Sequence, residues 1–239
     1  MNFESMCAEY LAEQEIYKGI GPSHVFDRLE ETVRSEWPSA TEKDFQWLAG
    51  ALQDENQKWF AAFVVTRVEP LPECLYLPLI QAGVNEPDPS LDGRFIQPCA
   101  WNFGLRRVNT TLLDILETGT NLEKAGAAKA MYWARSARAF VAGRGWMQAI
   151  TCGEKIREIH DDLSDLEERR CRLVLNEFVQ NEDEYLRRNI FPSLPLRPGT
   201  YPPDAEDLVR KAIAIARNHP DSFIREWMEQ EMKDQARSR

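Results

Sequence analysis

Three aspartates in the string HDDLSDLEE are the residues of this 239-residue chain best suited to carry out chemistry. Asp161, Asp162 and Asp165 are spaced D-D-x-x-D, which brings their carboxylates within about one turn of each other on a helix. Carboxylate oxygens are ligands that Mg²⁺ prefers in proteins, and a Mg²⁺ ion held in this way commonly binds the phosphates of a substrate. The spacing therefore raises a magnesium site as one hypothesis.

The helix that must position these aspartates argues against that role. At 100° per residue, Ile159, Leu163 and Leu166 define its buried face, and Asp161 and Asp165 point almost directly away from it. The motif resembles the magnesium-diphosphate site of prenyl transferases and terpene cyclases, which are also all-helical, but that site faces the interior of a helical bundle. No second metal-binding helix is evident, so we expect a solvated charged face.

Other catalytic and cofactor signatures are absent from the sequence. The histidines His24, His160 and His219 are isolated, and no H-E-x-x-H, G-x-S-x-G, P-loop or dinucleotide fingerprint occurs. The five cysteines are widely spaced without a C-x-x-C, which favours reduced thiols over a disulfide framework or a zinc site. We therefore expect no catalytic residues, no metal and no cofactor, and we favour a protein that is not an enzyme.

A basic stretch offers a different kind of site. No acidic residue occurs between Lys124 and Gly153, whereas five basic residues do. Arginine side chains next to an exposed indole ring can bind anions in bidentate fashion, and tryptophans outside the helical repeats are candidate anchors for a partner protein. The candidate binding residues, for a partner or an anion, are Lys124, Arg135, Arg138, Arg144, Trp146 and Trp37.

The overall charge limits the choice of partner. The formal net charge is −10, which disfavours a dedicated nucleic-acid binder because clustered Lys and Arg supply most of that affinity. The longest nearly apolar run, Cys74 to Val84, is far shorter than the roughly 20 residues of a membrane helix. The N-terminus carries early glutamates and fits neither a signal nor a transit peptide, so we expect a cytoplasmic protein without a membrane partner.

Helical periods dominate the chain, and the predicted fold class is all-α. The stretch LLDILETGTNLEKAGAAKAMYWA, Leu112 to Ala134, predicts a helical hairpin in which Gly119 ends the first helix and Asn121 caps the second. Similar units occur earlier, where Thr41 and Asp44 form a capping-box pattern. In these units the second helices share a frame that begins with a basic residue and continues with small residues. The three frames are Lys58 to Val65, Arg94 to Trp101, and Lys124 to Met131.

These frames resemble HEAT-type repeats of the armadillo-like α-solenoid class. The resemblance implies a right-handed superhelix of about five or six stacked helical hairpins in one domain, residues 1–239. It also implies that an aspartate in a turn bonds to the basic residue of a neighbouring repeat, for which Asp54 with Lys58 and Asp88 with Arg94 are candidates. The clearest repeats span 43–139, followed by an irregular long helix at 154–180, a Pro-rich connection at 191–203 and a closing helix pair at 204–234.

The function that this interpretation favours is protein binding. Repeats of this class stack to share an elongated core and present an extended concave surface. An acidic surface would select a partner protein that is basic or carries a basic segment. The alternative is a DNA-acting member of the same class, similar to the alkylpurine glycosylases, that uses the basic patch between residues 124 and 146.

Overall fold

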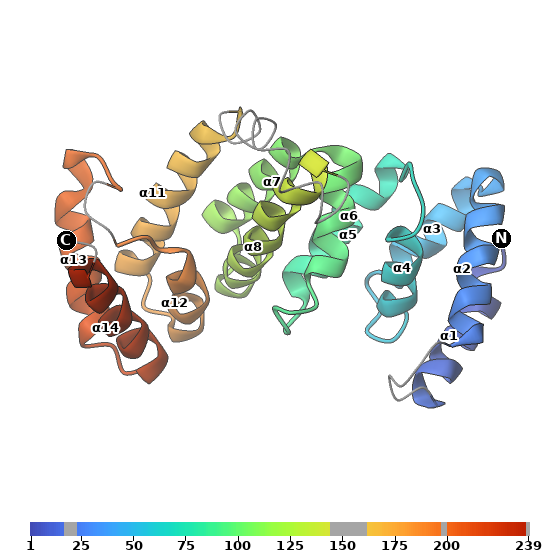
Figure 1. Cartoon of the computed structure of the whole chain (residues 1–239), viewed down its shortest axis with the longest axis horizontal. Helices are drawn as coiled ribbons and strands as arrows, with labels where there is room; N and C mark the ends of the chain where they lie inside the picture. The colour runs from blue at the N-terminus through green and yellow to red at the C-terminus, as the bar shows by residue number, and fades with distance from the viewer. Residues whose placement is uncertain (17–22, 144–161, 197–199, 238–239) are drawn as a thin grey trace. The chain divides into compact units, whose positions relative to one another are not determined.

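The structure is a computed structural model that describes residues 1–16, 23–143, 162–196 and 200–237 of the chain. These residues form α-helices and short 3-10 helices, and no strand occurs among them, which confirms the predicted all-α class (Figure 1). No helix in this described part is long and apolar enough to cross a membrane. The chain divides into two compact units, Met1–Val108 and Asn109–Arg239, and the boundary falls inside helix α7 (Leu105–Thr118).

The first unit is built from successive helices that pack in pairs. The α-helices α1 and α2, α3 and α4, and α5 and α6 contact each other (Figure 1). In addition, α1 contacts both α3 and α4, α3 contacts α5, and α4 contacts α6. The elements are α1 (Phe3–Ile16), α2 (His24–Glu36), η1 (Trp37–Ser39), α3 (Glu42–Ala51), α4 (Lys58–Val65), η2 (Glu73–Leu75), α5 (Tyr76–Asn85) and α6 (Gly93–Phe103).

In the second unit, too, helices of successive hairpins contact each other. Helix α8 contacts α12, α11 contacts both α12 and α13, and α13 contacts α14. Two ion pairs join α11 to α7, since Arg169 lies 2.8 Å from Asp114 and also pairs with Glu117. The elements are α7 (Leu105–Thr118), α8 (Asn121–Gly143), α11 (Ser164–Gln180), α12 (Glu184–Ile190), η3 (Phe191–Ser193), η4 (Pro203–Ala205), α13 (Glu206–Arg217) and α14 (Ser222–Arg237).

The three repeat frames occupy equivalent places in the structure. Lys58 begins α4, Arg94 is the second residue of α6, and Lys124 is the fourth residue of α8. The small residues of the frames are buried, as the alignment predicts: Ala61, Ala62, Ala100, Ala127, Ala128 and Ala130 are each at most 2% exposed. Helices can approach closely where such residues face each other, because no long side chain separates their backbones.

The turn between α7 and α8 confirms one predicted cap and corrects the other. Gly119 directly follows α7, and its amide donates to the Ile115 carbonyl at 2.8 Å. The N-cap of α8 is Thr120 instead of Asn121. The Thr120 amide donates to the Glu123 carboxylate at 2.8 Å, and the Glu123 amide donates back to the Thr120 hydroxyl at 3.4 Å. This is the reciprocal capping box, which satisfies amides that the first turn leaves unpaired.

Two further boundaries depend on single residues. The helical segment from Arg94 to Val108 is broken at Gly104, whose φ of 90° separates α6 from α7. Glycine adopts this conformation without the steric cost that a side chain adds. Asp204, the first residue of the predicted closing helix pair, lies in η4 before α13 and pairs with Arg172 at 3.3 Å.

Candidate functional site

The described members of the predicted basic patch are already close to carboxylates. Lys124 Nζ lies 2.6 Å from Glu177 Oε1 of α11, and these side chains are 13% and 17% exposed. Arg135 Nε lies 3.8 Å from Glu167 Oε1, and its side chain is 47% exposed. The positive charge of Lys124 is therefore compensated inside the fold, whereas Arg135 remains accessible at a loose ion pair.

The other candidates of the basic stretch lie outside the described residues. This holds for Arg144 and Trp146, and for the side chain of Arg138 at the end of α8. Their role as a binding patch stays a prediction.

Trp37, the remaining candidate anchor, is half-buried in η1. Its indole N–H donates to the Pro70 carbonyl at 3.3 Å, and its ring lies 5.4 Å from that of Phe45. The indole therefore makes contacts within its own unit, and its role as an anchor for a partner stays a prediction.

The aspartate cluster is only partly described. Asp161 lies outside the described residues, while Asp162 and Asp165 are exposed and Leu163 is 1% exposed. This agrees with the predicted orientation, in which leucine faces the core and aspartate faces solvent. Within the described ranges, no group of three or more His, Cys, Asp or Glu side chains is arranged to hold a metal ion.

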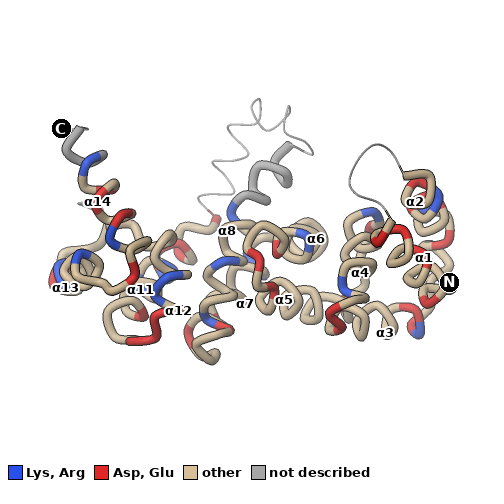
Figure 2. The backbone as a smooth tube through the Cα atoms, turned by 90° about the horizontal axis from the view of Figure 1, so that it is seen from below, with Lys and Arg blue, Asp and Glu red and all other residues tan. Residues whose placement is uncertain are grey.

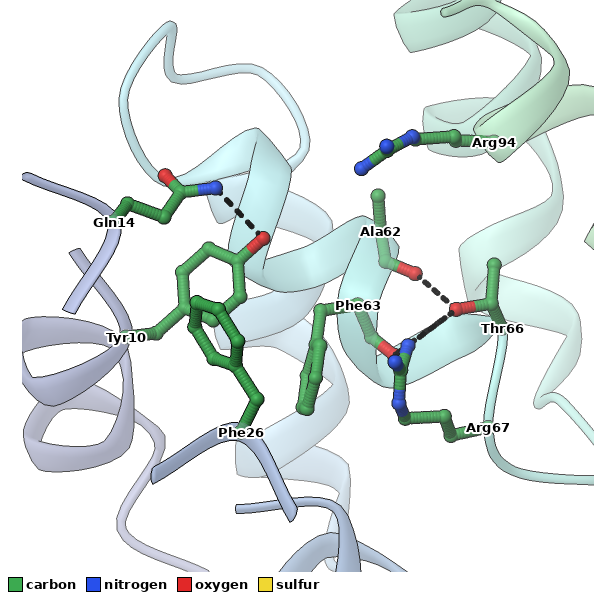
Figure 3. A pocket seen from close by; sticks show the side chains of 8 residues that line it. All are labelled: Tyr10, Gln14, Phe26, Ala62, Phe63, Thr66, Arg67 and Arg94. Atoms are coloured by element: carbon green, nitrogen blue, oxygen red, sulfur yellow. Dashed lines mark hydrogen bonds between the residues drawn. The ribbon is translucent and has the colours of Figure 1, made fainter. Parts of the chain in front are cut away.

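A cavity in the first unit brings together polar and aromatic groups that the sequence did not connect (Figure 3). Its volume is about 660 Å³, which lies within the range of small-molecule sites. Four helices and one helix end contribute to it. Its main lining residues are Tyr10 and Gln14 of α1, Phe26 of α2, Phe63 of α4, Arg67 just after α4, and Arg94 of α6.

Three aromatic rings form the apolar side of the cavity. The ring of Tyr10 lies 5.3 Å from that of Phe26 and 5.2 Å from that of Phe63, and Phe26 and Phe63 are 6.3 Å apart. These separations are typical of packed aromatic pairs. Because Tyr10 and Phe63 are 4% and 7% exposed, the rings are anchored in the core and present only part of their surface to the cavity.

Arg67 is fixed in place by several contacts. Its Nε lies 2.8 Å from Glu30 Oε2, its Nη1 donates to the Phe63 carbonyl at 3.0 Å, and its guanidinium stacks 3.8 Å from the Phe63 ring centroid. Glu30 also pairs with Arg34 at 3.0 Å, so that one carboxylate serves two guanidinium groups. Hydrogen bonding to Arg67 lowers the pKa of Glu30, which keeps this carboxylate charged.

Arg94 is the cationic group of the cavity that remains available. It is exposed, and Figure 3 shows its side chain reaching over Ala62 toward the side of the cavity where Tyr10 and Gln14 lie. Its guanidinium lies 5.9 Å from the Trp59 ring centroid. Among the residues that the structure describes, no carboxylate forms an ion pair with it, and the carboxylate of Asp88, its expected partner, accepts hydrogen bonds from the amide and hydroxyl of Ser90.

Tyr10 and Gln14 add neutral hydrogen-bond donors. Gln14 Nε2 donates to the Tyr10 hydroxyl oxygen at 2.9 Å, which leaves the hydroxyl proton of Tyr10 able to donate elsewhere. Burial raises the pKa of Tyr10, and the charges of Arg94 and Arg67 oppose this shift only in part. The hydroxyl is therefore protonated at neutral pH.

Sequence reasoning assigned no binding role to any residue of this cavity, although Arg94 and Phe63 lie in the repeat frames. The overlooked signal is the spacing of Phe3, Met6, Cys7 and Tyr10, which are all buried on α1 and follow the i, i+3, i+4, i+7 pattern of a helix. That pattern predicts the helix and the inward position of Tyr10. It does not predict Arg67 or Arg94 as neighbours, because they come from distant segments.

Comparisons of the chain with protein-family models, with curated proteins and with solved structures found no match.

Proposed function

We propose that the chain is a non-enzymatic protein-binding module. In this proposal its hairpins stack as a HEAT- or armadillo-like α-solenoid, and its acidic surface binds a partner protein that is basic or carries a basic segment. Stacked helical repeats expose broad surfaces that suit protein recognition, and their stability comes from neighbouring repeats.

One recurrent contact carries the structural part of the proposal. In the first unit, Lys58 at the start of α4 reaches Glu86, the C-cap residue of α5, with 3.0 Å between charged atoms. In the second unit, Lys124 in the first turn of α8 reaches Glu177 in the last turn of α11 at 2.6 Å. Each lysine therefore joins the second helix of one hairpin to the first helix of the next described hairpin. A repeated unit predicts such recurrence.

The distribution of charge supports a basic partner. Residues 1–108 contain 17 Asp and Glu against 9 Lys and Arg, so most of the net negative charge belongs to the first unit. Figure 2 marks these positions on the backbone. On α2, Asp27 and Glu31 are both exposed and lie one helical turn apart. Acidic surfaces of this kind accelerate association with basic partners and fix the register of the complex.

The nucleic-acid alternative receives less support from the described part of the basic patch. Lys124 is mostly buried in its ion pair with Glu177, and Arg135 lies near Glu167. A phosphate backbone would have to compete with these carboxylates. The acidic charge of the chain adds a further repulsion.

The test is capture of a stoichiometric partner by the tagged full-length chain. The capture is then repeated with variants in which exposed acidic residues are replaced by lysine. We expect the double variant Asp27→Lys, Glu31→Lys to weaken binding, with an effect that shrinks at high salt. The matched control is Glu182→Lys, Glu226→Lys, which makes the same charge change at exposed positions of the second unit. Equal binding by both double variants would reject the acidic surface of α2. Duplex DNA binding that is lost in Arg135→Glu would favour the alternative.

A further inference from the structure

We propose that the cavity formed by Tyr10, Gln14, Phe63 and Arg94 binds an anionic group, a carboxylate or a phosphate, that is attached to a flat apolar body. This inference goes beyond the proposed function, since it requires neither a solenoid nor a basic partner. It assigns to the first unit a ligand whose charge is opposite to that of the expected partner.

The polar side of the cavity consists of donors. The Arg94 guanidinium offers a planar fork that matches a carboxylate or phosphate, and no carboxylate of the described residues occupies it. The Tyr10 hydroxyl retains its proton for a ligand because its oxygen already accepts from Gln14. The Gln14 amide has a second N–H beyond the one it gives to Tyr10. Donors of this number and type favour an acceptor with several oxygens.

The local charge is positive although the first unit as a whole is acidic. The described residues that line the cavity include no Asp or Glu. Glu30 is the carboxylate next to Arg67, but Arg34 shares it, so these three groups together retain one positive charge. Other cations of this unit lie against acids, as Arg107 does with Glu73 and Arg28 with Glu9. Arg94 therefore stands out as a guanidinium directed toward a cavity instead of toward a carboxylate.

The apolar side of the cavity selects what carries the anionic group. The half-buried ring of Phe26, together with the small exposed parts of the buried Tyr10 and Phe63 rings, offers a surface on which another ring can pack. A cavity of about 660 Å³ has room for a ring together with its charged group. The same chemistry exists in a small aromatic acid and at the C-terminal carboxylate of a peptide that ends in an aromatic residue. The experiment must distinguish these two sources.

The experiment is a titration of the purified full-length chain with small probes, in which NMR or calorimetry measures binding. The probes are phenyl phosphate and N-acetylphenylalanine, with N-acetylphenylalaninamide as the uncharged match and inorganic phosphate as the anion without a ring. We expect the two charged aromatic probes to bind with a Kd of about 0.1–1 mM, and the amide and inorganic phosphate to bind at least about tenfold more weakly. Equal binding of the acid and its amide would overturn the proposal, as would no binding of any probe below about 10 mM.

A second arm separates the two sources of the ligand. A hexapeptide that ends in phenylalanine with a free carboxylate is compared with N-acetylphenylalanine. If the peptide binds more tightly, the surface around the cavity recognises a protein segment. If it binds equally or more weakly, the site takes a small acid. Both outcomes support the proposed chemistry, whereas equal binding of the same peptide with an amidated C-terminus would contradict it.

Variants tie the binding to the named side chains. We expect Arg94→Gln to weaken binding of N-acetylphenylalanine about tenfold or more, Arg94→Lys to retain part of it, and Tyr10→Phe to weaken it about fivefold. Lys43→Gln removes one exposed positive charge elsewhere in the first unit and should leave binding unchanged. Unchanged binding in a folded Arg94→Gln chain would overturn the proposal. The Asp27 and Glu31 variants test the partner protein separately, so the two proposals can fail independently.

Discussion

The ammonium group of Lys58 lies 3.0 Å from Glu86 Oε2, and the two side chains are only 8% and 4% exposed. A second carboxylate, that of Glu55, lies 2.6 Å from the same ammonium but is 83% exposed. Burial alone would lower the pKa of Lys58, yet the hydrogen bonds and charges of Glu55 and Glu86 outweigh it and raise this pKa. The pair joins α4 to the end of α5 as a buried, charged connection.

We predict that Lys58→Met destabilises the first unit by about 3–5 kcal/mol, because it removes the buried ammonium group that lies against the Glu86 carboxylate. Adding Glu86→Leu should recover a large part of the loss, since apolar replacement of both partners removes the buried negative charge as well. Urea unfolding of the three chains measures this. As a control, Glu55→Gln removes the exposed partner and should cost less than about 1 kcal/mol. If the Lys58→Met chain is as stable as the Glu55→Gln chain, the buried pair of Lys58 and Glu86 does not stabilise the first unit.

The repeat frames could be predicted from the sequence, but the partners of their lysines could not. Aligning Lys58 with Lys124 places both in the first turn of a second helix, and the structure confirms this. We expected Asp54 as the partner of Lys58, whereas the Asp54 carboxylate accepts from backbone amides of its own turn and Lys58 pairs with Glu86. Spacing identifies neighbours along one turn. A partner 28 residues away depends on how two hairpins pack.

The same limit explains why the sequence did not predict the cavity of the first unit. Tyr10, Arg67 and Arg94 lie in segments separated by tens of residues, so no motif connects them. The basic patch drew attention because its members follow one another in sequence, but proximity in sequence did not leave Lys124 available. Helix ends and caps were more predictable than tertiary contacts. One cap was nevertheless assigned to the wrong residue, because Thr120 with Glu123 fits the capping-box pattern better than Asn121 does.

Gly83 provides a test of close packing between α5 and α6. A Cβ atom at this position would lie 2.6 Å from Ile96 Cδ1 and 2.8 Å from Ile96 Cγ1, and Ile96 is fully buried. We predict that Gly83→Ala destabilises the chain by about 1–3 kcal/mol through overpacking, although alanine favours a helix.

Gly50→Ala is the matched control for that substitution. Gly50 is also helical, in α3, but apart from its chain neighbours and the nearby backbone of its own helix no atom of the described residues lies within 4 Å of its added Cβ. This variant should gain roughly 0.5–1 kcal/mol from helix propensity. Thermal or urea unfolding of both variants gives the comparison. A Gly83→Ala chain that is stabilised as much as Gly50→Ala would show that α5 and α6 are not in close contact there.

Ala127 tests whether the small residues of the frames are needed. It is 0% exposed on α8, which packs against α12. We predict a loss of about 1–3 kcal/mol for Ala127→Leu from overpacking and a larger loss, about 3–5 kcal/mol, for Ala127→Glu, which adds an unpaired buried charge. The control is Leu122→Glu, since Leu122 lies in the first turn of the same helix and is 66% exposed. In urea unfolding, its change should stay within about 0.5 kcal/mol.

His219, between α13 and α14, makes stability depend on pH. The residue is 3% exposed, and its Nδ1 accepts the Asp221 amide at 3.2 Å. Burial, together with the nearby charge of Arg187, lowers the pKa of His219 below its ordinary value of 6.5, while Asp221 and Glu184 act in the opposite direction. The unfolded chain therefore takes up the proton first. Stability from this group is fully present above pH 6.5 and is lost as the pH falls through the folded pKa.

Replacement of His219 by asparagine isolates this effect, because an asparagine side chain would offer an acceptor near the position of Nδ1 and would not titrate. We expect the unfolding free energy of the native chain to fall between about pH 7.5 and pH 5.5, with a slope of at most about 1.4 kcal/mol per pH unit from this group. His219→Asn should show a flatter profile. The matched control is His24→Gln, which changes an exposed histidine of the first unit. Identical slopes in the native and His219→Asn chains would contradict the assignment, because protonation of Nδ1 would then not oppose its hydrogen bond to Asp221.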